Sequence, residues 1–215
     1  MAQIVSFTFN PFYENTYIIY DETGECVVID PGCYTKKEQL ALSTFISENK
    51  LTPVFLLNTH CHIDHVLGNK YVAETYNLPF LMPEGEQIVL DEVVNYAPSM
   101  GMNYQKSPDP ETFVVEGVDI TFGNTVLKVI SAPGHSPDSV CFYCEKDKFI
   151  SSGDVLFYDS IGRTDLPGGN YQTLMESIKN KLMVLPDDVK VYAGHMQSTT
   201  IGRERKLNPF LNEKY

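Results

Sequence analysis

The densest group of chemically capable side chains is the segment Thr59-His60-Cys61-His62-Ile63-Asp64-His65. It places three imidazoles and one carboxylate within six residues, directly after an apolar stretch. Imidazole and carboxylate are common ligands of divalent metals. Without a cation, protonated imidazoles gathered in so small a volume would repel one another. The segment therefore predicts a metal site.

The remaining two histidines and one further aspartate continue this pattern. His135 ends the motif Ala-Pro-Gly-His, His195 ends Tyr-Ala-Gly-His, and Asp154 ends Ser-Ser-Gly-Asp. Each follows a glycine at the end of a predicted strand, where the missing Cβ lets the backbone turn tightly and bring the next side chain close to an ion. These residues, together with the first segment, supply enough ligands for two metal sites.

In this order, the motifs His-x-His-x-Asp-His, Pro-Gly-His, Gly-Asp and Gly-His resemble the metallo-β-lactamase superfamily. Within it, the chain is most similar to the short branch of the glyoxalase II-like (hydroxyacylglutathione hydrolase-like) enzymes. Three further similar segments are NPFYENTYIIYDETGECVVIDPG, SIGRTDLPGG and STTIGRERKLNPF. The resemblance covers nearly the whole chain.

The resemblance implies seven ligands divided between two divalent ions. One ion would bind His60, His62 and His135, the other would bind Asp64, His65 and His195, and Asp154 would bridge them. Two ions ~3.5–4 Å apart can share a hydroxide whose pKa is near 7, which makes a nucleophile at neutral pH. Asp64 and Asp154 are therefore also expected to be catalytic. Zinc is the preferred metal, although iron and manganese suit the same donors.

Two further residues are expected to support this centre. The two ions outweigh the charge of the aspartates and the hydroxide, so the site favours a small anionic ester or thioester. Arg163, in Ile-Gly-Arg-Thr, resembles the basic position that contacts substrate in glyoxalase II enzymes, and we expect it to bind a substrate carboxylate. Asp30, in Val-Ile-Asp-Pro-Gly, is expected to orient a ligand or its loop without touching metal.

The leading hypothesis is hydrolysis of hydroxyacyl thioesters. Fuller glyoxalase II enzymes carry a helical carboxyl-terminal extension that recognises glutathione, and this chain stops soon after Asn208, so glutathione recognition is left open. One alternative is an oxidoreductase similar to the persulfide dioxygenases, with a single iron; the retained Asp64, His65 and His195 argue against it. Another is a lactone hydrolase, which would share the same metal motif.

Composition restricts the partners. The chain has 16 Lys and Arg against 28 Asp and Glu, a net charge of −12 with no basic run, so nucleic acid and anionic membranes are not expected partners. No apolar run approaches the ~20 residues of a spanning helix, and no leader segment is evident, which predicts a cytoplasmic protein. Five cysteines, an odd count, favour reduced thiols.

The motifs must be positioned by the elements around them. Alternating segments predict strands at residues 4–9, 16–21 and 25–30, and a capping box, Thr35-Lys36-Lys37-Glu38, predicts a helix to about Asn49. A buried strand at 54–57 leads into the histidine segment, and helices are expected at 69–76 and 85–96. The role of the loop at 98–112 is left open.

A second β-rich half is expected from Phe113 onward. Its predicted strands cover residues 118–123, 125–133, 139–145, 148–154 and 190–195. A last amphipathic helix carries Leu174, Ile178, Leu182 and Leu185, and a polar carboxyl-terminal segment follows. Two β-rich halves with helices predict an α/β fold, a four-layer αββα sandwich of two mixed sheets face to face, in a single domain of residues 1–215.

Overall fold

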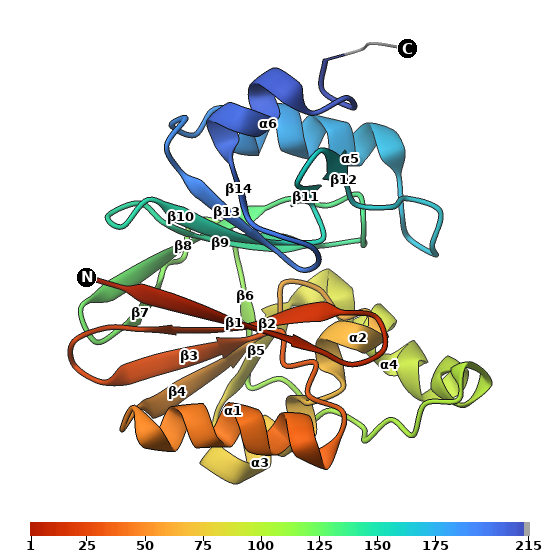
Figure 1. Cartoon of the computed structure of the whole chain (residues 1–215). Coiled ribbons are helices and arrows are strands. Elements are labelled where there is room, and N and C mark those ends of the chain that lie inside the picture. Colours follow the sequence, from red (N-terminus) through yellow and green to blue (C-terminus); the bar gives the residue numbers. More distant parts are fainter. Residues whose placement is uncertain (213–215) are drawn as a thin grey trace. The chain divides into compact units, whose positions relative to one another are not determined.

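The computed structural model describes residues 1–212 of the chain and divides it into two compact units. Unit 1 comprises Met1–Val114 and Thr121–Thr125, and unit 2 comprises Val115–Ile120 and the described part of Val126–Tyr215. The first six-stranded sheet lies in unit 1, and the second lies in unit 2 except for residues 121–122 of its strand β7 and residue 125 of its strand β8 (Figure 1).

The first sheet is mixed. Its strands β1, β2 and β3 pair antiparallel, whereas the pairs β3–β4, β4–β5 and β5–β6 are parallel. In spatial order the strands are β1 (Gln3–Phe9), β2 (Glu14–Tyr20), β3 (Glu25–Ile29), β4 (Thr52–Leu57), β5 (Phe80–Pro83) and β6 (Thr112–Val114). Because β2 runs opposite to β3, the beginning of β2 lies at the same sheet edge as the ends of β3, β4 and β5.

The second sheet is also mixed. Strands β10 and β13 are parallel, whereas the pairs β13–β14, β9–β10 and β8–β9 are antiparallel. In spatial order they are β14 (Thr199–Thr200), β13 (Lys190–Ala193), β10 (Phe149–Gly153), β9 (Val140–Cys144), β8 (Thr125–Ser131) and β7 (Ile120–Phe122). A separate hairpin pairs β11 (Leu156–Phe157) with β12 (Ser160–Ile161).

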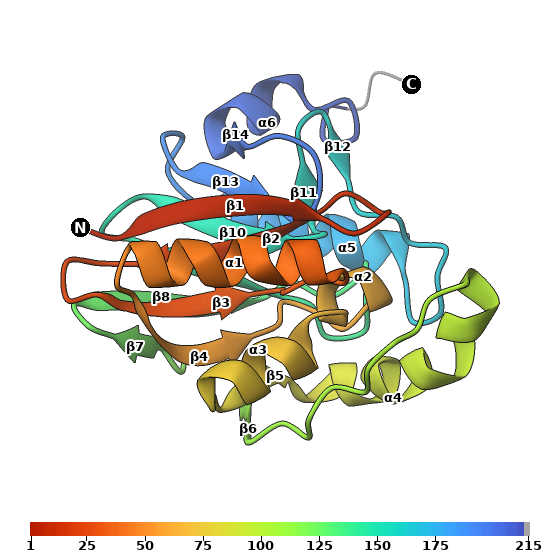
Figure 2. The same ribbon diagram turned by 60° about the horizontal axis from the view of Figure 1, so that its bottom comes forward.

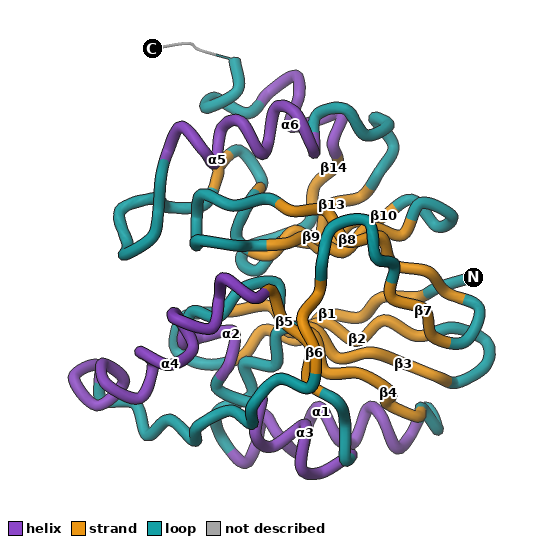
Figure 3. Tube along the Cα trace, turned by 180° about the vertical axis from the view of Figure 1, so that it is seen from behind, coloured by secondary structure: helices purple, strands orange, loops and turns teal. Residues whose placement is uncertain are grey.

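Helices cover one face of each sheet. In unit 1, α1 and α3 lie along the first sheet (Figure 2), and in unit 2, α5 and α6 lie along the second (Figure 3). The helices are α1 (Lys36–Glu48), α2 (Ile63–Val66), α3 (Asn69–Tyr76), η1 (Glu84–Glu86), α4 (Gln87–Tyr96), η2 (Ala97–Met100), α5 (Tyr171–Ser177), the π-helix η3 (Ile178–Leu182) and α6 (Ile201–Leu207). Within residues 1–212, no helix has the length and apolar character needed to cross a membrane.

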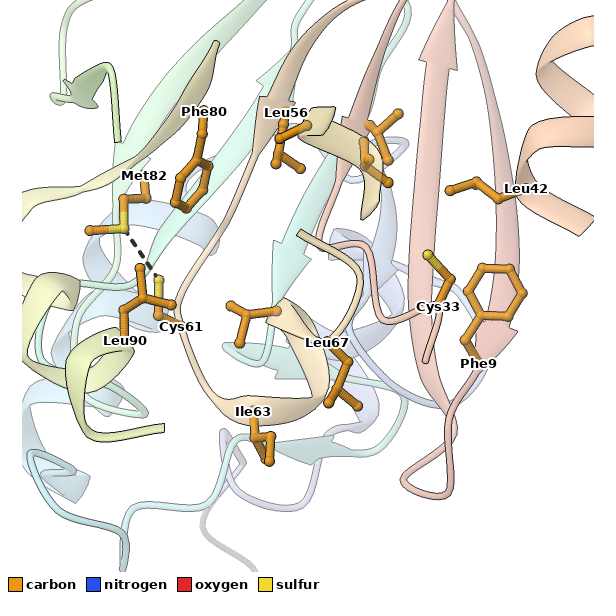
Figure 4. Packing of buried hydrophobic residues seen from close by; sticks show 14 of the residues in the cluster. Phe9, Cys33, Leu42, Leu56, Cys61, Ile63, Leu67, Phe80, Met82 and Leu90 are labelled. Carbon is orange, nitrogen blue, oxygen red and sulfur yellow. Dashed lines mark hydrogen bonds between the residues drawn. The ribbon is translucent and has the colours of Figure 1, made fainter. Parts of the chain in front are cut away.

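The core of unit 1 reaches into the histidine segment. Leu42 of α1, Leu56 of β4 and Phe80 of β5 are buried in one apolar cluster, which also contains Cys61 (Figure 4). The Sγ of Cys61 lies 3.6 Å from the Sδ of Met82. Burial raises the pKa of the Cys61 thiol well above its usual range. Cys61 therefore anchors its segment in the core, while the neighbouring His60 and His62 supply the imidazoles of the predicted metal site.

Most predicted elements are confirmed, with three corrections. Residues 112–114, on the border of the expected second half, form β6 of the first sheet, because this short strand gains its pairing only from β5 in space. The last amphipathic helix ends in the π-helix at Leu182, so Leu185 lies beyond it. Residues 201–207, expected as a polar segment, form α6, whose sequence carries too few apolar residues to show periodicity.

The predicted capping box of α1 is confirmed and gives a stability prediction. The Glu38 N–H donates to Thr35 Oγ1 (3.3 Å), and the Thr35 N–H donates to Glu38 Oε2 (2.7 Å). We expect T35A to lower the free energy of unfolding by about 1 kcal/mol, because a helix N–H loses its acceptor. Urea denaturation measures this loss. T35S keeps the hydroxyl and is the control, and equal stability of T35A and the wild type would contradict the role of the cap.

Candidate functional site

The parallel strands of unit 1 bring two segments of the chain to one sheet edge. Ile29, the last residue of β3, pairs with Leu57, the last residue of β4. The Asp30 N–H also donates to the Leu57 carbonyl (2.9 Å). The turn that begins at Asp30 and the histidine segment that follows β4 therefore leave the sheet side by side.

Four of the predicted ligands, His60, His62, Asp64 and His65, gather in unit 1, and we call them the first ligand set. His60 and His65 are fully buried, and their ring centroids are 4.1 Å apart. The rings of His60 and His62 are 4.9 Å apart. His65 Nε2 lies 3.7 Å from Asp64 Oδ2. The sequence folds here into the single turn α2, which places Asp64 and His65 on a helix.

Asp30 fixes the orientation of two of these imidazoles. Its Oδ2 lies 3.1 Å from His65 Nδ1 and accepts a hydrogen bond from the Thr59 hydroxyl (2.6 Å). Thr59 Oγ1 is also 3.0 Å from His60 Nδ1. Because the Thr59 proton goes to Asp30, its oxygen accepts from the Nδ1–H of His60. Both rings thus hold their proton on Nδ1, which leaves the lone pair of Nε2 available for a metal ion.

The backbone of the first ligand set has further supports that the sequence did not reveal. The Cys61 N–H donates to Oε2 of the fully buried Glu86 (2.9 Å), and Asn58 Nδ2 donates to the His65 carbonyl (3.0 Å). Asn10 Nδ2 donates to the Asp64 carbonyl (3.0 Å). Asn58 and Thr59 adjoin the histidine motif, which is a usable signal. Glu86 and Asn10 are distant from the motif in sequence, and no sequence signal indicates their role.

The other three predicted ligands, His135, Asp154 and His195, gather in unit 2 as the second ligand set. β10 and β13 are parallel and pair Gly153 with Ala193, so the residues after these strands leave the sheet at one edge. His135 Nε2 and His195 Nε2 each lie 3.5 Å from Asp154 Oδ2. His135 Nδ1 lies 2.8 Å from the Arg163 carbonyl, which can only accept, so the Nε2 of neutral His135 keeps its lone pair.

Two glycines allow this close approach. Gly134, which precedes His135, has φ +129°, and a Cβ there would overlap the backbone of Leu174 in α5. A Cβ on Gly162 would overlap the carbonyl oxygen of Asp154. The first glycine was expected from its place before a ligand. The second lies in the Ile-Gly-Arg-Thr segment and lets the chain pass directly behind Asp154.

The carboxyl-terminal helix holds the hairpin that follows Asp154. Arg203 donates from both terminal nitrogens to the Asp159 carboxylate (2.7 and 2.9 Å), and its guanidinium lies 3.6 Å from the ring centroid of Tyr158. The fully buried Glu204 accepts from the Asp159 N–H (2.9 Å) and from Asn208 Nδ2 (2.9 Å). This network explains the segment STTIGRERKLNPF in structural terms: α6 fixes the tip between β11 and β12.

Arg163 lies at the surface of unit 2, where it forms an ion pair with Asp165. Its side chain is 61% exposed and is bound to Asp165 by two hydrogen bonds, Nε to Oδ1 and a terminal nitrogen to Oδ2, both 2.7 Å. The hydrogen bond with Asp165 raises the pKa of Arg163. The structure thus places a charged, accessible guanidinium in unit 2, where it already has a carboxylate partner. Binding of a substrate carboxylate stays a prediction.

The donor chemistry of both ligand sets fits divalent metal ions. Imidazole nitrogens and carboxylate oxygens suit zinc, iron and manganese. The Nδ1 contacts of His60, His65 and His135 leave their Nε2 atoms available for a metal ion. Metal-binding histidines are usually supported in this way. Asp30 also lies close to His60 and His65, with donor atoms within 4.8 Å. Its oxygens are engaged by Thr59 and by the Nδ1 side of His65. That Asp30 orients ligands without touching metal stays a prediction.

Comparison with known proteins identifies the class. A family model described as the metallo-beta-lactamase superfamily matches residues 9–195. The chain belongs to the metallo-β-lactamase superfamily, a family of metallo-hydrolases, and its two mixed sheets with helices have the α/β fold of that family. The predicted fold class and family are confirmed. The fold implies divalent metal ions, and the His and Asp clusters of this chain could hold them.

Three known proteins are similar to this chain over most of its length. Hydroxyacylglutathione hydrolase GloC of Haemophilus influenzae is 34% identical over 94% of this chain and 95% of that protein. The crystal structure of the B3 metallo-beta-lactamase BLEG-1 is 34% identical, with a TM-score of 0.90 over 98% of this chain and 100% of that chain. TTHA1623, solved in a di-iron-bound form, is 34% identical, with a TM-score of 0.86 over 96% of this chain and 100% of that chain.

Proposed function

We propose that this chain is a dinuclear metal-dependent hydrolase of small anionic hydroxyacyl thioesters. The observation that carries the proposal is the arrangement of the two ligand sets. All seven expected ligands lie in the segments that follow β4, β8, β10 and β13, and the Nδ1 atoms of three of the histidines are fixed by neighbouring groups. The similarity to a hydroxyacylglutathione hydrolase supports the thioester class. Family membership supports the joint use of both sets.

The proposed ligand roles follow the sequence prediction. His60, His62 and His135 would hold one ion, Asp64, His65 and His195 would hold the other, and Asp154 would contribute to both. The contacts of Asp154 with both His135 and His195 agree with a shared carboxylate, because each of these histidines is assigned to a different ion. Zinc is the proposed metal, and the di-iron form of TTHA1623 makes iron the metal to compare with it.

The residues of the chain then have distinct tasks in hydrolysis. Two divalent ions supply a Lewis acid for the substrate carbonyl and activate water near neutral pH. Asp30 and Thr59 hold His65 and His60 in the tautomer that presents Nε2, so no reorientation is needed when substrate binds. Arg163 attracts the negative charge of the substrate and exchanges its Asp165 partner for it.

Metal analysis combined with activity tests the proposal. Protein purified without added metal is analysed by mass spectrometry for metal content and is assayed with S-lactoylglutathione, a simple acyl thioester and a β-lactam. We expect two metals per chain and turnover of thioesters. Cleavage of the β-lactam alone would contradict the thioester assignment. One iron per chain, with oxygen uptake on a persulfide and no thioester cleavage, would replace the hydrolase by a dioxygenase.

Arg163 gives a separate prediction about substrate charge. We expect R163A to raise KM for an anionic thioester by roughly 3- to 10-fold with little change in kcat, because an exposed charge contact contributes modestly to binding in both ground and transition state. Steady-state kinetics with an anionic and a neutral thioester measure the effect. D165N, which removes the negative charge that competes for Arg163, is expected to lower KM for the anionic substrate. An unchanged KM in R163A would contradict the proposed contact between Arg163 and the substrate carboxylate.

A further inference from the structure

Glu14, at the beginning of β2, is a buried carboxyl group to which the proposed chemistry assigns no task. Its side chain is fully buried, and Oε2 lies 3.0 Å from the Thr16 hydroxyl. Within residues 1–212, Oε1 has no hydrogen-bond partner. A buried carboxylate anion needs donors on both oxygens. Glu14 therefore has the surroundings of a neutral acid.

Other buried carboxylates of unit 1 show the contrast. Asp30 and Asp21 each meet four polar groups on their two oxygens. Although burial raises the pKa of Asp21, hydrogen bonds from its neighbours, first among them Thr23, lower it to about 2. Within the described part of the chain, the carboxyl group of Glu14 has a hydrogen-bond partner only in Thr16. Burial raises the pKa of this carboxyl well above the usual range.

The hydrogen bonds of Thr16 indicate which group donates. The Gly32 N–H donates to Thr16 Oγ1 (2.8 Å), and the same oxygen lies 3.0 Å from both the Asp30 carbonyl and Glu14 Oε2. A hydroxyl has one proton and two lone pairs. The Asp30 carbonyl can only accept, so it takes the proton of Thr16. The remaining lone pair of Thr16 is satisfied only if Glu14 donates its own proton.

Two routes connect the first ligand set to the hydrogen bonds of Thr16 with Glu14, Asp30 and Gly32. Through the Asp30 carbonyl, this network fixes a turn in which Asp30 has φ +49°, and this turn aims the Asp30 carboxylate at His65 and Thr59. Through Gly32, the network reaches Asn10, whose Nδ2 donates both to the Gly32 carbonyl (3.1 Å) and to the Asp64 carbonyl (3.0 Å).

The packing leaves no room for a looser arrangement. A Cβ on Gly32 would overlap Glu14 Oε2 and would lie 2.7 Å from the Asp64 carbonyl oxygen. The Glu14 carboxyl, the Gly32 backbone and the backbone of Asp64 are therefore in close succession. A shift of the Glu14 group is transmitted to a ligand-bearing backbone instead of being absorbed by empty space.

We propose that Glu14 is a positioning residue that donates a hydrogen bond to Thr16 and so holds the Asp30 turn and Asp64 in the geometry that binds metal. This inference rests on the proposed metal centre, and it concerns metal affinity instead of the identity of the substrate. It predicts that a neutral donor of the same shape can replace Glu14, whereas an apolar side chain of similar volume cannot.

The test compares Glu14→Gln with Glu14→Leu. Metal-free proteins are titrated with zinc against a chromophoric chelator, and their thermal unfolding is followed by circular dichroism. We expect E14Q to keep the wild-type zinc affinity within about threefold, because its amide N–H supplies the same donor. We expect E14L to bind zinc at least about 10-fold more weakly, as is typical when an outer support of a metal ligand is lost.

Control variants separate positioning from general destabilisation. D21A removes a buried carboxylate at the opposite end of β2 and is expected to lower the melting temperature without changing zinc affinity. If E14L does not fold, Thr16→Val and Thr16→Ser make the same comparison at the next residue of the network, with loss of affinity expected only for T16V.

The outcomes are distinguishable from those of the proposed function. Wild-type zinc affinity in E14L or T16V would overturn the positioning role. Equal losses in E14Q and E14L would overturn donation by a neutral group. Two zinc ions in the wild type without thioester turnover would contradict the proposed substrate but leave this inference standing. A wild type that binds no zinc would contradict both the proposed zinc centre and the positioning role of Glu14.

Discussion

Replacement of Asp154 by alanine is expected to abolish thioester hydrolysis while the fold stays intact. Asp154 Oδ2 lies 3.5 Å from the Nε2 of both His135 and His195, so the substitution removes the only carboxylate of the second ligand set. The loss of kcat/KM should exceed the roughly 10–100-fold typical of residues that merely support a ligand. Steady-state kinetics and metal analysis of the purified variant measure both consequences, and H62A is expected to behave alike.

The control for this prediction is D188A. Asp188 lies in unit 2 and forms an exposed ion pair with Lys148, and such pairs contribute little to stability. We expect D188A to keep full activity and two metals per chain, and D154A to keep the wild-type circular dichroism spectrum. Near-wild-type turnover of D154A would rule out the dinuclear mechanism, whereas loss of its folded spectrum would show that Asp154 is structural.

The sequence predicted the elements that carry strong local signals. The capping box at Thr35, the alternation of β1 to β3 and the apolar run of β4 depend on neighbouring residues alone, and each is present in the structure. The metal motif was equally visible, since four of its members lie within residues 60–65. Strand ends and preceding glycines then indicated where His135, Asp154 and His195 would leave the second sheet.

Residues that support the site from a distance gave no such signal. Glu86 accepts from the Cys61 N–H, and Glu14 contacts Thr16, yet neither belongs to a recognisable motif, and each is indistinguishable in the sequence from a surface residue. The burial of Glu86 accompanies a contact with a segment 25 residues earlier in the chain. A contact distant in sequence likewise explains β6 and α6, whose partners β5 and the β11–β12 hairpin are separated from them in sequence.

The second large effect is expected at Asp30. D30A would leave four polar groups without their acceptor: the Thr59 N–H and hydroxyl, Asn58 Nδ2 and His65 Nδ1. Because an unsatisfied buried donor costs about 1–3 kcal/mol, we expect the free energy of unfolding of the metal-free protein to fall by about 3 kcal/mol or more. Zinc affinity should fall roughly 10–100-fold, since His60 and His65 lose the contacts that orient them.

D21A is the matched control, because Asp21 is also buried in unit 1 and also accepts from four donors. We expect D21A to cost comparable stability in urea denaturation but to leave zinc affinity unchanged, since its hydrogen-bond partners Thr23, Asn124 and Thr125 belong to neither ligand set. The comparison separates the two effects of a buried carboxylate, holding the fold and orienting a ligand. If D30A and D21A changed zinc affinity equally, Asp30 would act only through stability, and the contacts to Thr59 and His65 would have no role specific to the metal.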